Sequence, residues 1–166
     1  MEPEQVSGAG GDWQVIHEVI DRSVVRQRNK LACGIACGEM LLRDRGIEDV
    51  DQARLARDTK VPVSCGGLAR TLNTVSPKGV GVWIGGSLRI PKASDVELFE
   101  VLNSTGSWAA VLRQPLARYG HIVIVDGIDV TGRVLIRDPW EGTRYRMEMQ
   151  EFLNYWTTEG IFLNTS

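Results

Sequence analysis

The sequence lacks the features that define several common classes of protein. Its apolar runs, such as residues 122–125, are no longer than a β-strand, so we expect no membrane span. The N-terminal residues MEPEQVSGAGGDW contain no apolar stretch and do not form a secretory signal. Lysine and arginine form no block along the chain, so nucleic acid is not an expected partner.

Cysteine and histidine are scarce. The chain has Cys33, Cys37 and Cys65, and its histidines are His17 and His121. An odd, small number of cysteines without a secretory signal argues against a disulfide framework. Cys33 and Cys37 form one closely spaced pair, but no second Cys/His pair follows at the spacing of a zinc finger. We therefore expect neither a metal site nor a cofactor. At least one thiol is therefore free, and the question is whether one of them is reactive.

The composition is that of one soluble globular domain. The 166 residues are 43 % hydrophobic and 24 % charged, with a formal charge of −2 and a pI of about 5.7. The acidic, Gly-rich residues 1–12 are predicted to be a flexible tail, and residues 13–166 to form the domain. We expect a cytoplasmic protein, or one delivered to another cell by a route that needs no signal peptide. The sequence leaves open that it is a segment of a larger chain.

The hydrophobic pattern changes from helical to strand-like along the chain. Helical spacing or caps predict helices at residues 13–20, 33–45, 49–58, 66–75, 95–103 and 149–156. Short β-branched or aromatic runs predict strands at residues 80–84, 108–112, 121–126, 134–137 and 160–164. Helices first and antiparallel strands afterwards predict an α+β domain, with a helical N-terminal part packed on a sheet of about four or five strands.

Cys33 is the candidate nucleophile. It lies at the start of the predicted helix 33–45, where the helix dipole stabilises a thiolate and so lowers the thiol pKa. Gly34 follows it and would let the backbone approach a substrate closely.

A catalytic thiolate needs an imidazole that takes and returns protons, and the imidazole needs an acceptor that fixes its orientation. His121 follows Gly120 and opens the apolar strand HIVIV, at the end of a strand where a cleft can form. Asp138 ends the strand VLIRD and is followed by Pro139. If these strands form a hairpin through residues 126–132, His121 and Asp138 come together.

Gln27 is the candidate for the oxyanion hole. Acyl transfer passes through an oxyanion that needs hydrogen-bond donors already in place. Gln27 precedes Cys33 by six residues, so its amide could turn toward the site. The backbone N–H of Cys33 would be the second donor.

These residues resemble the papain-like peptidases that remove double-glycine leader peptides from bacteriocins. The resemblance rests on Gln27, the helix start Cys33-Gly-Ile-Ala-Cys37, the Gly120-His121 strand and the Asp138-Pro139 strand end. It covers about residues 24–163, including Phe152, Trp156 and Gly160 in the closing helix and strand. It implies a papain-like fold and a peptide or protein substrate. The implied catalytic residues are Cys33, His121, Asp138 and Gln27.

The chain departs from this family at Ala32, where an acidic residue is usual, and it has no nucleotide-binding loop of an exporter. An effector or antibacterial toxin domain, with a cognate immunity or inhibitor protein as partner, is therefore an alternative to a leader peptidase. A glutamine deamidase with the same triad and a catalytically silent peptide-binding module also remain open.

Other residues have weaker functional readings. Cys65, beside a glycine pair that opens a helix, is a rival nucleophile. His17 is expected to be exposed on an amphipathic helix, since HEVID lacks the second histidine of a zinc-protease motif. Trp140 either lines the substrate cleft or belongs to the core. The residues expected to contact substrate are Gly34, Gly120 and Trp140.

Overall fold

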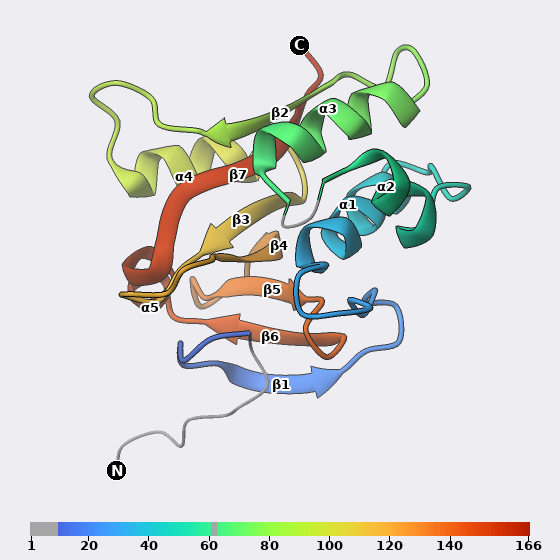
Figure 1. Ribbon diagram of the computed structural model, residues 1–166. Coiled ribbons are helices and arrows are strands. Elements are labelled where there is room, and N and C mark those ends of the chain that lie inside the picture. The colour runs from blue at the N-terminus through green and yellow to red at the C-terminus, as the bar shows by residue number, and fades with distance from the viewer. Residues whose placement is uncertain (1–9, 61–62) are drawn as a thin grey trace.

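A computed structural model of the protein describes residues 10–60 and 63–166 (Figure 1). These residues form a seven-stranded antiparallel sheet with the spatial order β1-β6-β5-β4-β3-β7-β2. The strands are β1 (Ile16–Ile20), β2 (Val82–Ser87), β3 (Trp108–Leu112), β4 (His121–Ile128), β5 (Val134–Asp138), β6 (Thr143–Met147) and β7 (Trp156–Asn164).

Helices cover both faces of this sheet. They are α1 (Cys33–Arg43), α2 (Gln52–Asp58), α3 (Cys65–Val75), α4 (Asp95–Asn103) and α5 (Met149–Tyr155). Asp51, Ser64 and Ser94 cap α2, α3 and α4 by accepting a hydrogen bond from a backbone N–H of the first turn. Figure 1 shows α1 and α2 on one side of the sheet, and α4 and α5 on the other. None of these helices is long and apolar enough to cross a membrane.

The central strands are covered by helices on both faces, which explains why the apolar runs in the second half of the sequence do not alternate with polar residues. Successive residues of β4 enter different cores: Ile122 and Ile124 pack under α1 and α3, while Val123 and Val125 pack under α4 and α5. A strand with helices on both faces buries every side chain, so its sequence is continuously apolar. The predicted α+β arrangement of helices on an antiparallel sheet is confirmed.

The sheet is larger than the four or five strands predicted. In β6 the side chains of Thr143, Tyr145 and Met147 are buried, whereas Arg144 is exposed. This period-2 alternation is typical of a strand, and the prediction overlooked it because charged residues separate the apolar ones.

The helix predicted at residues 13–20 is wrong. The segment contains the edge strand β1, which pairs with β6 and has an irregular register between Ile16 and Val19. His17 lies in this irregular part with φ of 55°. Its predicted exposure is confirmed, but its predicted helix is not. Pairing with a strand distant in sequence overrides the local helical spacing.

Candidate active site

Cys33 is the first residue of α1, as predicted. The preceding Ala32 provides no side-chain cap, and the first turn contains no acidic residue. The N-terminal N–H groups of α1 are therefore not satisfied by a side chain, and no carboxylate neutralises the positive end of the helix. Both features favour an anion at this position.

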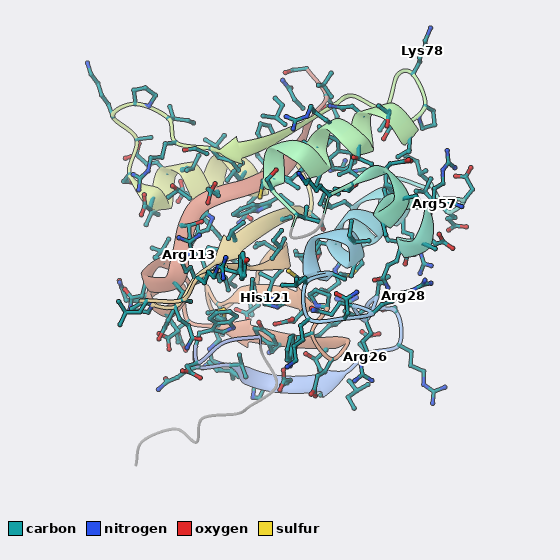
Figure 2. All side chains as sticks on the ribbon, in the orientation of Figure 1. Arg26, Arg28, Arg57, Lys78, Arg113 and His121 are labelled. Carbon is teal, nitrogen blue, oxygen red and sulfur yellow. The ribbon has the colours of Figure 1, made fainter. Side chains whose placement is uncertain are left out.

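His121, labelled in Figure 2, and Asp138 lie together at adjacent ends of two central strands. His121 is the first residue of β4 and Asp138 the last residue of β5, and these strands form the predicted antiparallel hairpin. The ring Nε2 of His121 lies 2.7 Å from Oδ1 of Asp138. Because Nε2 is engaged by the carboxylate, Nδ1 is the ring nitrogen left for another partner.

The Asp138 carboxylate is buried and accepts two further hydrogen bonds. The backbone N–H of Trp140 donates to Oδ1 at 2.9 Å, and the hydroxyl of Tyr145 donates to Oδ2 at 2.7 Å. Burial alone would raise the pKa of Asp138, but the charge of His121 and these hydrogen bonds outweigh it and lower the pKa. The carboxyl group therefore remains ionised inside the protein.

Sequence reasoning missed Tyr145 and Trp13. Tyr145 comes from β6, beside β5, and its hydroxyl accepts a hydrogen bond from Nε1 of Trp13 at 3.1 Å. This places a chain of three side chains behind the histidine, from Trp13 through Tyr145 to Asp138. The alternation in β6 could have pointed to Tyr145 as an inward residue. Nothing local in the sequence marks Trp13.

Cys33 and His121 perturb one another as an ion pair would. Burial raises the pKa of the Cys33 thiol, but a hydrogen bond to His121 and the charge of that ring outweigh burial and lower it. The backbone N–H groups of Ile122 and Gly34 also lower the pKa. Burial lowers the pKa of His121, whereas Asp138 and then Cys33 raise it, to about 10. The site thus favours thiolate and imidazolium over the neutral pair.

Two indole rings enclose the His121 ring. Trp13 stacks on it with centroids 6.0 Å apart and an interplanar angle of 18°, and Trp140 meets it edge-on at 6.4 Å. Gly10 also packs on the ring, since a Cβ at this position would lie 2.7 Å from an imidazole carbon. Gly10 was predicted to belong to a flexible tail; of that tail, residues 1–9 lie outside the described residues.

A cavity of about 430 Å³ opens beside Cys33 and His121. Gly120 and Trp140, two of the residues expected to contact substrate, line it. Gly34 does not line this cavity and instead packs closely against Val63 and Ile122. The remaining lining residues are Gly10, Lys30, Leu31, Val63, Ser64, Cys65, Val111, Arg113, Tyr119, Ile122 and Glu159.

Gln27 is tied to the strand end that carries Asp138. Its backbone N–H donates to the carbonyl of Pro139 at 2.7 Å, and its side-chain Nε2 donates to the carbonyl of Asn29 at 2.7 Å. Among the described residues it makes no hydrogen bond to Cys33, and its Oε1 is buried without a partner. The structure thus holds Gln27 against the segment that follows Asp138, outside the lining of the cavity, with its amide directed at the Asn29 turn.

The other cysteines are not activated. Burial, followed by the charge of Glu159, raises the pKa of Cys65 to about 12. Burial raises the pKa of Cys37 well above its usual value, and its Sγ lies 3.3 Å from the carbonyl oxygen of Ile122. Over residues 10–60 and 63–166, no three His, Cys, Asp or Glu side chains gather in a way that could hold a metal ion.

A cysteine-bearing helix packed on an antiparallel sheet, with a histidine and a carboxylate at adjacent strand ends of that sheet, is the arrangement of a papain-like cysteine peptidase. The chain belongs to the Peptidase_C39 like family, which it matches over residues 19–160. The predicted resemblance is thereby confirmed, and the chain is a cysteine peptidase by family.

Two known proteins show the similarity in detail. Cysteine protease effector 1 of Escherichia coli O1:K1:H7 is 40% identical over 155 residues, which are 93% of this chain and 29% of that protein. The chain thus spans less than a third of the length of that relative. The peptidase domain of Streptococcus ComA, a bi-functional ABC transporter involved in a quorum sensing pathway, has the same fold. The TM-score is 0.68 at 20% identity, covering 86% of this chain and 97% of the other.

Proposed function

We propose that this chain hydrolyses a peptide bond of a protein substrate through an acyl-enzyme on Cys33. The observation that carries the proposal is the geometry of the site: Cys33, at the start of α1, and His121 line one cavity, and Nε2 of His121 is held 2.7 Å from buried Asp138. A thiolate beside an imidazolium is the reactive form of a cysteine nucleophile, and the carboxylate keeps the ring oriented.

The proposed steps use groups of Cys33, His121 and Gln27, together with one water molecule. The Cys33 thiolate attacks the scissile carbonyl, and the carbonyl oxygen becomes an oxyanion near the start of α1. The Cys33 N–H and the Gln27 amide donate to this oxygen, which requires the amide to exchange its Asn29 partner for the substrate. His121 protonates the leaving amine, then removes a proton from water, and the resulting hydroxide releases the acyl group from Cys33.

The chain is also proposed to act as the protease part of an effector, because the relative with 40% identity is named one. Its substrate would then be a protein of another cell. A cognate immunity protein would protect the producing cell. Growth of bacteria that express the wild type, compared with the Cys33→Ala variant, tests this part: equal growth of both would contradict it.

Proteome-wide mass spectrometry tests the hydrolysis itself. A bacterial lysate is incubated with the wild type or with Cys33→Ala, and newly formed protein N-termini are labelled and identified. We expect new N-termini with the wild type alone. Glutamine deamidation without new termini would assign the site to the alternative chemistry, and binding without either change would indicate a silent module.

A further inference from the structure

A second cavity adjoins the one beside Cys33. Its volume is about 590 Å³, and it lies between the end of α2 and the start of α3. Ser64, the residue that caps α3, lines both cavities, so the two are neighbours at the start of α3. Its lining includes Asp58, Lys60, Ser64, Gly67 and Arg70. The second cavity is therefore within reach of a peptide that lies in the first.

Unpaired positive charge faces this second cavity. Lys60 and Arg70 are exposed, and neither forms an ion pair with any described residue. The Arg70 guanidinium reaches back over the first turn of α3, since its nitrogens lie 3.7 and 3.8 Å from where a Cβ would sit on Gly66 and Gly67. Asp58 is the one acidic residue in the lining.

The helix that opens into the cavity adds to this positive potential. The first turn of α3 contains no acidic residue, so the N-terminal end of its dipole is not neutralised from within the helix. The paired glycines leave this turn without side chains, so its backbone is accessible between Ser64 and Arg70.

The part of the chain that contains this cavity is richer in positive charge than the chain as a whole. Residues 22–78 contain 11 Lys and Arg against 6 Asp and Glu, although the full chain is net negative. Two of these acids, Glu39 and Asp44, are already paired with arginines of the fold. Figure 2 shows further cations, Arg28 and Arg57, along the same helical side of the molecule. An acidic substrate segment would be attracted to this side.

We propose that the cavity between Lys60 and Arg70 is a substrate subsite that binds an Asp or Glu side chain on one flank of the scissile bond. The bound peptide would run from Cys33 across Ser64, and its carboxylate would meet Arg70 and Lys60. This inference rests on the proposed hydrolysis at Cys33 and adds a rule for substrate selection, which the triad does not provide.

A library of proteome-derived peptides measures this preference. The wild type is incubated with the library, and the residues around each cleaved bond are read by mass spectrometry. Arg70→Glu and Lys60→Glu are compared with Lys78→Glu, which reverses a charge beyond the opposite end of α3 (Figure 2). Asp58→Asn, which removes the competing acid, is the complementary variant. Thermal unfolding shows that each variant is folded.

We expect Asp and Glu to be enriched at one fixed position relative to the bond cut by the wild type. Arg70→Glu is expected to lower kcat/KM for such peptides by roughly tenfold, since an exposed attraction becomes a repulsion, and to leave neutral peptides unaffected. Lys60→Glu acts in the same direction, Lys78→Glu has no effect, and Asp58→Asn strengthens the preference. Added salt weakens it.

Cleavage without any acidic preference, or equal behaviour of Arg70→Glu and Lys78→Glu, would overturn the subsite while leaving hydrolysis intact. If the wild type cuts no peptide, the hydrolysis proposal fails separately. The subsite is then tested by binding, from the peptides that the Cys33→Ala protein captures from the library. Enrichment of acidic peptides that is lost when Arg70→Glu is added to Cys33→Ala supports the subsite. Capture without acidic enrichment overturns it.

Discussion

Tyr145 donates its hydroxyl to Oδ2 of Asp138 at 2.7 Å, on the opposite oxygen from the one that His121 contacts. The same hydroxyl accepts a hydrogen bond from Trp13, so the carboxylate is held from both sides. Burial of a carboxylate is costly unless its oxygens are hydrogen-bonded, and here the two side-chain partners, His121 and Tyr145, come from different strands. The orientation of His121 thus depends on residues outside the predicted triad.

Tyr145→Phe is expected to lower kcat with little change in KM, because Asp138 loses a donor and holds the imidazolium less firmly. The loss of a buried hydrogen bond to a charged group should reduce the free energy of unfolding by about 1–3 kcal/mol. Peptide hydrolysis and urea unfolding measure the two effects. Tyr155→Phe is the matched control, since Tyr155 contacts the Trp13 ring edge-on and its hydroxyl donates to no described residue. Equal effects of the two changes would contradict a special role for Tyr145.

The cysteines are expected to differ in reactivity with pH. Alkylation by iodoacetamide requires the thiolate, so Cys33 should reach half of its maximal rate below pH 9.0, its unperturbed pKa. Cys65, with a pKa of about 12, should remain nearly inert throughout this range. Site-resolved mass spectrometry from pH 4 to pH 9 separates the two. His121→Ala should move the Cys33 profile upward, and an unchanged profile would exclude the ion pair.

Cys33→Ala is expected to reduce hydrolysis by at least about 10³-fold, because the covalent step is lost. Cys65→Ala is the control for the rival nucleophile. It removes a thiol from the wall of the same cavity and should retain most of the activity. Initial rates of the three proteins on one cleaved peptide decide between the candidates. Activity lost in Cys65→Ala and kept in Cys33→Ala would reverse the assignment.

His121 and Asp138 should make stability depend on pH. The folded pKa of His121 is raised from 6.5 to about 10, so the folded state binds a proton more tightly than the unfolded state. The resulting stabilisation is complete below pH 6.5 and is lost as the pH rises through about 10. In a Cys33→Ala background the contribution of Cys33 to the raised pKa of His121 is absent, so the upper limit of the window falls below about 10. In this background, urea unfolding should show the advantage of Asp138 over Asp138→Asn shrinking as the pH rises above 6.5. A constant difference would contradict the linkage.

Arg137 is expected to matter for stability because its buried side chain pairs with two partly exposed carboxylates. Its guanidinium binds Asp44 at the end of α1 and Asp126 of β4, so it joins the nucleophile helix to the sheet. Arg137→Ala should lower the free energy of unfolding by about 1–3 kcal/mol, because Asp44 loses its partner while Asp126 keeps Ser107 and a longer contact to Arg144. Arg133→Ala, which breaks an exposed pair with Glu148, should cost less than about 1 kcal/mol. Urea unfolding of both variants tests the contrast, and equal losses would contradict it.

Local sequence patterns predicted most of the helices and strands correctly. The predictions failed for strands whose partners are distant in the sequence. The helices α1 to α5 were found because caps and helical spacing act within a few residues. The strand β1 was predicted as a helix because only its partner β6 fixes it as a strand. β6 was missed because its polar outward residues hid the alternation.

The sequence by itself determined which residues are the candidates for the catalytic triad and on which helix or strand each one lies. A cysteine at a helix start, a histidine opening one strand and an aspartate closing the next can be read locally, and the hairpin between the two strands is short enough to predict.

Only the tertiary structure decided what surrounds these residues. Tyr145 lies near Asp138 because β5 and β6 are paired. Trp13 covers His121 although more than 100 residues separate them, and Ser64 lines two cavities because α3 packs beside α1. The physical reason is that burial, hydrogen bonding and pKa shifts depend on distances in space, which local sequence patterns do not specify.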